Sequence, residues 1–268
     1  MSYFQVEPRL KLYYLDENQE GFPTVLLLHG LGANGSSWLL QFPALLEAGF
    51  CILAPDTPGF GQSTYPGGGT SVAKLTAAIA RLLESRQDTP MHVVGISLGG
   101  TQALQLALDY PQYVRKLILV NTFAKLDFLS NTLAWPYFAW RFILVHTLGI
   151  PTQARYVANK LFPHPNQNFL RQALYEQIIQ SDPQAYRAAL RAIVQFDITS
   201  RLCEIYCPTL VVTGQDDTTV PPEAQCALAN GINGARQVIL PDAGHGIIVE
   251  QPEKFNHAML EFLKGTAG

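Results

Sequence analysis

The chain has 268 residues, of which 48% are hydrophobic and 15% charged, and its formal net charge is −3. This length suffices for one large α/β domain, or for a domain with an insertion, around a sizeable buried core. The slightly negative charge, without a cluster of Lys or Arg, argues against a basic surface for nucleic acid. The first residues do not form a positively charged segment followed by an apolar one, so we expect no secretory signal. We therefore expect a cytoplasmic protein.

Before residue 90 the sequence predicts three strands and one helix, at residues 10–15, 24–28, 50–54 and 71–85. The second strand is wholly apolar after its threonine, which is typical of a buried parallel strand, and His29-Gly30-Leu31-Gly32 follows at once. We interpret His29 as a residue that hydrogen-bonds to loop backbone. We expect Asp56, which follows the third strand, to cap the turn at Pro58-Gly59.

The most informative stretch runs from Met91 to Ala107. An apolar strand, Met91–Ile96, meets a G-x-S-x-G turn, and an alanine-rich helical pattern follows. A nucleophile elbow requires this strand–turn–helix context, and its glycines avoid clashes with the strand and the helix. Ser97 is therefore the candidate nucleophile. The backbone N–H of Leu98, at the start of the helix, is placed to face a developing oxyanion.

After a strand at residues 116–121 the alternation of strands and helices stops. Residues 122–197 are rich in aromatics and predict helices at residues 126–148, 152–161, 167–180 and 183–196. The apolar stretch 133–150 is about one membrane span long, but Pro136, Arg141 and His146 interrupt it. A charged residue at mid-span costs about 2.5–3.5 kcal/mol on insertion scales, so we expect no integral membrane span.

Two further candidate residues follow strands near the end of the chain. A strand at residues 208–213 leads to Asp216 and Asp217, and a strand at residues 237–240 precedes His245. Open α/β sheets place their sites beyond the carboxyl ends of the strands. A serine hydroxyl needs an imidazole to take its proton, and the imidazole needs a carboxylate to fix its tautomer. The chain order Ser, Asp, His therefore predicts a catalytic trio.

The cysteines indicate neither a disulfide framework nor a metal site. Cys51, Cys203, Cys207 and Cys226 are scattered, with no C-x-x-C pair and no nearby histidine. We expect free, mostly buried thiols, which fit a reducing compartment.

Together these motifs resemble those of α/β-hydrolase-fold serine hydrolases of the small esterase, lactonase and carbon–carbon hydrolase group. The resemblance runs from about Leu10 to Phe262 and rests on His29-Gly30, Asp56–Ser63, the elbow, Pro111–Asn121, Gly214–Asp217, Gly244-His245 and Glu250–Glu253. It implies an α/β fold with a mostly parallel central sheet flanked by helices. It also implies a core of residues 1–121 and 198–268 and a helical cap inserted at residues 122–197.

The resemblance assigns roles to particular residues. In similar proteins the acid lies three residues after the strand-end glycine, here Gly214, which selects Asp217 over Asp216. The turn after an early strand gives the second oxyanion donor, here the backbone N–H of Leu31. Family members with an aspartate nucleophile are dehalogenases and epoxide hydrolases, and the serine at position 97 argues against both. The cap aromatics expected to line an apolar pocket are Trp135, Phe138 and Trp140.

The predicted function is cleavage of a small carboxylic ester with a modest, largely apolar group, through an acyl-enzyme and without metal or cofactor. A lactonase, a perhydrolase and a carbon–carbon hydrolase acting on ring-cleaved aromatic diketones share this machinery and stay open. So does a hydrolase-fold ligand receptor that keeps the trio without turnover. The sequence leaves the oligomeric state undetermined. A carbon–carbon hydrolase would bind an acidic substrate, and the candidate cap residues are Arg141, Arg155, Arg171, Arg187 and Arg191.

Overall fold

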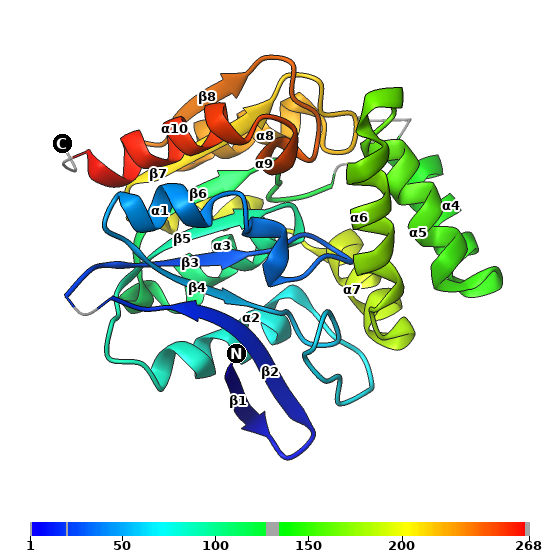
Figure 1. The fold of residues 1–268 in the computed structure, drawn as a ribbon, viewed down its shortest axis with the longest axis horizontal. Helices are drawn as coiled ribbons and strands as arrows, with labels where there is room; N and C mark the ends of the chain where they lie inside the picture. The colour runs from blue at the N-terminus through cyan, green and yellow to red at the C-terminus, as the bar shows by residue number, and fades with distance from the viewer. Residues whose placement is uncertain (1, 20, 127–133, 266–268) are drawn as a thin grey trace.

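A computed structural model describes residues 2–19, 21–126 and 134–265 (Figure 1). Within them one sheet has the strand order β1-β2-β4-β3-β5-β6-β7-β8. The strands are β1 (Ser2–Glu7), β2 (Leu10–Glu17), β3 (Thr24–Leu28), β4 (Cys51–Pro55), β5 (Met91–Ile96), β6 (Val114–Val120), β7 (Thr209–Gly214) and β8 (Arg236–Leu240). β2 pairs antiparallel with β1 and β4, and the pairs from β4 to β8 are parallel. This is the mostly parallel sheet that the sequence predicts.

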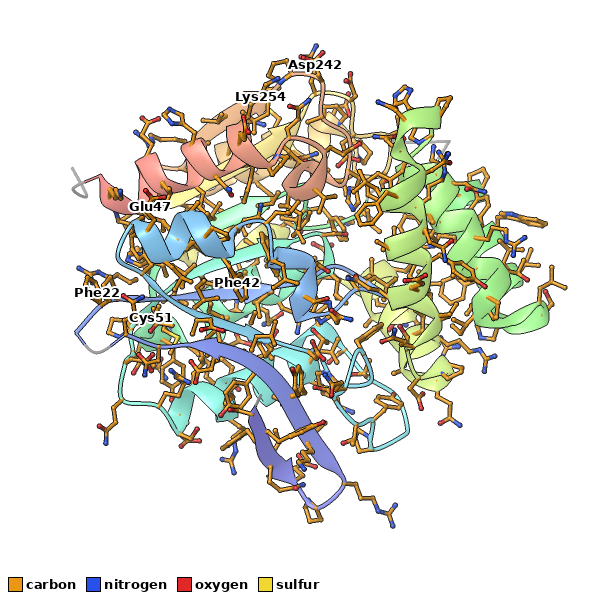
Figure 2. The ribbon with its side chains drawn as sticks, viewed as in Figure 1. Phe22, Phe42, Glu47, Cys51, Asp242 and Lys254 are labelled. Atoms are coloured by element: carbon orange, nitrogen blue, oxygen red, sulfur yellow. The ribbon has the colours of Figure 1, made fainter. Side chains whose placement is uncertain are left out.

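The central strands are buried on both faces because their apolar side chains alternate between two cores. In β3, for example, Val25 and Leu27 belong to one core and Leu26 and Leu28 to the other. The core with Val25 also contains Phe42, labelled in Figure 2. Its helices are α1 (Phe42–Glu47), α9 (Ile247–Glu250) and α10 (Pro252–Lys264). The opposite core is covered by α2 (Val72–Glu84), α3 (Leu98–Asp109) and α8 (Pro222–Gly231).

The sequence prediction misses β1 and places the other strand ends within two residues. Ser2–Glu7 alternates half-buried and exposed residues, and it pairs with β2 so that Tyr3 lies opposite Tyr13. A short edge strand carries a weak pattern of its own, and the hairpin partner supplies its hydrogen bonds.

Between β6 and β7, the described part of residues 122–197 is mostly helical and lies beside the sheet (Figure 1); we refer to this segment as the insertion. An ion pair of 2.8 Å between Lys125 Nζ and the Asp197 carboxylate, together with a β-bridge, links its two ends. Residues 127–133 of the first predicted helix lie outside the described residues. No helix in the described part of the chain has the length and apolarity needed to span a membrane. The insertion contains α4 (Ala134–Thr147), α5 (Gly149–Leu161), α6 (Asn168–Ile179) and α7 (Pro183–Gln195).

His92 of β5 makes the stability of the fold sensitive to acid. Its side chain is buried, and its ring meets that of Phe50 edge-on with 5.7 Å between centroids. Burial, helped by Arg115 and Lys116, lowers the pKa of His92 from 6.5 to about 4. The unfolded chain therefore takes up the proton first as the pH falls. We expect protonation linked to His92 to lower the free energy of unfolding by about 3 kcal/mol as the pH falls from 6.5 to about 4.

Denaturant unfolding of the wild type and of His92→Gln across this pH window measures that cost. The variant should lose part of the acid slope, because glutamine does not titrate. An identical slope in both proteins would show that His92 is not responsible.

Candidate active site

Ser97 lies in the turn between β5 and α3, with φ 53° and ψ −116°. This backbone conformation is costly for a residue with a side chain and persists only where neighbours hold it. The Ser97 N–H donates to the Val120 carbonyl at 3.0 Å, and the Ser97 carbonyl accepts from the Thr122 hydroxyl at 2.7 Å. A Cβ on Gly99 would stand 2.0 Å from the Leu28 carbonyl oxygen, so this close approach requires glycine.

His245 and Asp217 meet in the loops that follow β8 and β7. His245 Nδ1 and Asp217 Oδ2 are 2.9 Å apart, and both side chains are buried. The other carboxylate oxygen, Oδ1, accepts from the N–H groups of Thr219 at 2.7 Å and Val220 at 3.0 Å. With the carboxylate fixed in this way, the imidazole donates from Nδ1 and keeps its lone pair on Nε2. The neighbouring Asp216 is exposed.

Asn121 ties together the loops that carry these two residues, a role that the sequence analysis did not identify. It is buried at the end of β6 with φ 44°. Its Nδ2 donates to the carbonyls of Gly244 at 2.9 Å and His245 at 3.0 Å, and its Oδ1 accepts from the Gly214 N–H at 2.8 Å. Asparagine tolerates a positive φ and carries both a donor and an acceptor, which suits it to this role. The sequence feature that could have indicated the role is a polar residue directly after an apolar strand.

Two backbone donors lie beside Ser97. Leu98 begins α3, where the first N–H groups have no intrahelical acceptor, and Leu31 lies in the turn after β3. Neither N–H donates a hydrogen bond to any described residue. A Cβ on Gly30 would lie 3.7 Å from the Ser97 Cβ, so this turn adjoins the elbow. Leu31 also lines the same cavity as Ser97.

His29 and Asp56 hold loops by hydrogen bonds to backbone, as expected for His29, whereas the partners of Asp56 lie outside the Pro58-Gly59 turn that it was expected to cap. His29 Nε2 accepts from the Thr57 N–H at 2.9 Å, and Nδ1 lies 2.8 Å from the carbonyl of the next residue. Burial lowers the pKa of His29, so the neutral ring donates from Nδ1. Asp56 accepts from the N–H groups of Gly35 at 2.7 Å and Gln62 at 2.8 Å. It thereby joins its own turn to the loop after β3.

Ser97, His245 and Leu31 line one cavity of about 160 Å³ between the sheet and the helical insertion. Three side chains of the insertion that carry polar groups, Tyr137, Arg141 and Gln177, also line it. The apolar part of the wall includes Phe138, Val157, Leu161, Phe162, Leu174 and Ile193. A mostly apolar cavity with a few polar groups is typical of a site for a small molecule.

The three aromatics expected to line the pocket have different positions. Phe138 is 6% exposed and belongs to the cavity wall. Trp140 is 46% exposed and is not part of the wall, because two residues along a helix turn the side chain to another face. The structure thus corrects the expectation for Trp140. The side chain of Trp135 lies outside the described part of the chain.

Sequence reasoning also missed contacts that join the insertion to the core beside the site. Gln177 Oε1 of α6 accepts from the Ser37 hydroxyl at 3.0 Å. Gln167 Nε2 donates to Glu250 Oε1 at 2.9 Å, five residues after His245. Burial raises the pKa of Glu250, and the hydrogen bond from Gln167 opposes this effect. No periodic pattern marks such contacts, because their partners are far apart in the sequence.

Comparison with known proteins agrees with this geometry. A model of the alpha/beta hydrolase fold family matches residues 23–252. The chain belongs to this family. The predicted fold is thereby confirmed, and this α/β hydrolase has its serine elbow and its His–Asp pair at the carboxyl ends of parallel strands, where sheets of this kind place their sites.

Similar α/β hydrolases carry different names. A Variovorax paradoxus protein provisionally named carbamate hydrolase RutD is 32% identical over 264 residues, 95% of this chain and 96% of the relative. The 3-oxoadipate enol-lactonase 2 of Acinetobacter baylyi is 28% identical, covering 94% of this chain and 93% of the relative. The crystal structure of an enol-lactonase from Burkholderia xenovorans has a TM-score of 0.90 at 25% identity, covering 98% of this chain and 100% of that one. The chain is therefore a hydrolase of this fold.

Proposed function

We propose that this α/β hydrolase is a serine hydrolase that cleaves small carboxylic esters through Ser97, His245 and Asp217. One observation carries the proposal. The strained Ser97 lines the same cavity as His245, whose Nδ1 lies 2.9 Å from Asp217 Oδ2. A serine, an imidazole and an orienting carboxylate in this relation are the parts that acyl transfer requires.

In the first half of the reaction Ser97 Oγ attacks the ester carbonyl while His245 Nε2 takes the hydroxyl proton. Asp217 holds the imidazole tautomer and stabilises its charged form. The N–H groups of Leu31 and Leu98 donate to the oxyanion, and losing one such donor typically costs about 2.7–4 kcal/mol. The C–O bond then breaks, and the alcohol leaves with the proton from His245. Ser97 is left as an acyl ester.

In the second half, a water molecule gives its proton to His245 and attacks the acyl carbonyl. The carboxylic acid leaves, and His245 returns the proton to Ser97. The same steps open a lactone, which is a cyclic ester. The similarity to two enol-lactonases makes lactone opening the second candidate function.

A substrate panel tests the proposal. It contains p-nitrophenyl esters from acetate to octanoate, γ- and δ-lactones, and aryl carbamates, the last because of the similarity to the protein named carbamate hydrolase. We expect turnover of the shorter esters with a burst of p-nitrophenol that equals the enzyme concentration, because an acyl-enzyme accumulates. Binding without turnover of any panel member would indicate a ligand receptor instead.

We propose that residues 122–197 act as a cap that sets acyl-chain preference, because their side chains form much of the apolar cavity wall. Phe138→Ala removes a ring from that wall and so enlarges the cavity. We expect the relative kcat/KM values across the ester series to change about 10- to 200-fold. Trp140→Ala is the matched control, since it removes an exposed aromatic two residues away. If both variants keep the wild-type chain-length profile, Phe138 does not determine selectivity.

We propose a cytoplasmic location. Free thiols are typical of proteins from a reducing compartment. All four cysteines are free. Cys51 is buried at the start of β4 (Figure 2), whereas Cys203 and Cys226 are exposed, so the expectation of mostly buried thiols is wrong.

A further inference from the structure

Arg141 is a buried cation in the wall of the catalytic cavity. This α4 residue is 5% exposed and lines the cavity together with Ser97. A guanidinium stays charged inside a protein, so its burial is costly unless anions or hydrogen-bond acceptors compensate. Arg141 forms no ion pair with any Asp or Glu of the described residues.

Among the described residues, Arg141 has one hydrogen bond within 3.5 Å, to Tyr186. Its Nη2 donates to the Tyr186 hydroxyl at 2.7 Å, and this oxygen also accepts from Gln153 Nε2 at 3.3 Å. Arg141 Nε is buried and has no partner among the described residues. The buried hydroxyl of Tyr137 lies beside the guanidinium without completing a well-formed hydrogen bond. The N–H groups of Arg141 therefore outnumber the acceptors that reach them, at the part of the cavity wall formed by Tyr137 and Arg141.

The aromatic neighbours of Arg141 do not remove this shortage. The Arg141 Cζ lies 5.4 Å from the Tyr137 ring centroid and 5.8 Å from that of Phe138. Such contacts stabilise the cation through the ring face, but they accept none of the in-plane N–H hydrogen bonds. An acceptor with negative charge would satisfy both the charge and the donors.

We infer that Arg141 binds a carboxylate of the substrate in the cavity where Ser97 attacks the scissile carbonyl. The planar fork of the guanidinium matches a carboxylate and forms short, charge-assisted hydrogen bonds with it. This inference rests on the proposed function and narrows its substrate class. Because the cavity lining is mostly apolar, the part of the substrate that joins its ester carbonyl to the carboxylate is expected to be apolar. Monoesters of short dicarboxylic acids and lactones with a free carboxylate have this chemistry.

Matched ester pairs test the inference. The acidic members are the monomethyl esters of succinic, glutaric and adipic acids, and the neutral members are methyl butanoate, pentanoate and hexanoate. For the best pair we expect the wild type to prefer the acidic ester at least about 10-fold in kcat/KM. Arg141→Met should lower kcat/KM for the acidic ester by about 10- to 100-fold and leave the neutral ester within about threefold. Arg191→Met is the control, because Arg191 is exposed on α7; it should keep the wild-type ratio.

A ratio of acidic to neutral activity separates recognition from a structural role, because a weakened fold lowers both activities together. Inhibition gives a second readout that does not depend on ester turnover. Pentanoate should inhibit the wild type at least about 10-fold more strongly than the uncharged pentanamide, and Arg141→Met should lose this difference. Equal inhibition by pentanoate and pentanamide together with equal kcat/KM for acidic and neutral esters in the wild type would overturn the inference. So would a variant that loses both ester activities equally while folded.

Two further experiments apply if Arg141→Met does not fold or if no ester is hydrolysed. If Arg141→Met does not fold by circular dichroism, Arg141→Lys retains the charge without the fork, and an intermediate loss of the acidic preference is expected. An unchanged preference in folded Arg141→Lys and a wild type that does not discriminate pentanoate from pentanamide both count against the inference. If no ester is hydrolysed at all, the proposed function fails separately, and calorimetric binding of pentanoate against pentanamide still decides on Arg141.

Discussion

Replacing Ser97 by alanine is expected to lower kcat by about 10⁵- to 10⁶-fold, because the nucleophile of an acyl-transfer trio is indispensable to covalent catalysis. The fold should persist, since alanine adopts the same backbone conformation at a similar cost and the elbow hydrogen bonds involve backbone atoms of residue 97. Steady-state hydrolysis of p-nitrophenyl butyrate, with circular dichroism as the folding control, measures the effect. A folded Ser97→Ala protein with more than a hundredth of wild-type kcat would contradict the assigned nucleophile.

Replacing Asp217 by asparagine is expected to lower kcat by about 10⁴-fold, since an amide in place of the carboxylate favours the wrong imidazole tautomer. The matched change at the neighbouring residue, Asp216→Asn, should stay within about threefold of the wild type. The structure gives the reason for the difference. Asp217 Oδ2 lies 2.9 Å from His245 Nδ1, whereas Asp216 is exposed.

Both asparagine variants are compared in the same p-nitrophenyl butyrate assay, with thermal unfolding as the check on the fold. Oδ1 of Asp217 accepts two backbone hydrogen bonds, and the amide oxygen of asparagine can retain them, so a large loss of stability is not expected. A severe loss of kcat in Asp216→Asn with a mild one in Asp217→Asn would show that the other carboxylate orients His245.

Features encoded by short segments could be predicted from the sequence. The G-x-S-x-G turn between an apolar strand and an alanine-rich helix defines the elbow, because close approach of backbones makes glycine obligatory at Gly99. The apolar run of β3 after Thr24 indicated a parallel strand with both faces buried. A polar turn residue such as Asp56 could be assigned to backbone hydrogen bonds for the same local reason.

Features that depend on distant partners could not be predicted. The insertion helix α4 is apolar on several faces, so periodicity does not distinguish the buried Phe138 from the exposed Trp140. Among the cap arginines only tertiary packing against Tyr186 of α7 shows that Arg141 is buried. Asn121 gains its role from two loops that lie more than ninety residues further along the chain. In each case the deciding contact joins residues from different elements.

Covalent labelling with a small fluorophosphonate, followed by peptide mass spectrometry, tests most directly whether Ser97 is the nucleophile. The probe reacts with an activated serine and needs no knowledge of the natural substrate. We expect one modified peptide that contains Ser97, saturation of labelling at one probe per chain, and loss of labelling in Ser97→Ala. Labelling of a different serine in the folded wild type, or unchanged labelling of Ser97→Ala, would show that Ser97 is not the nucleophile.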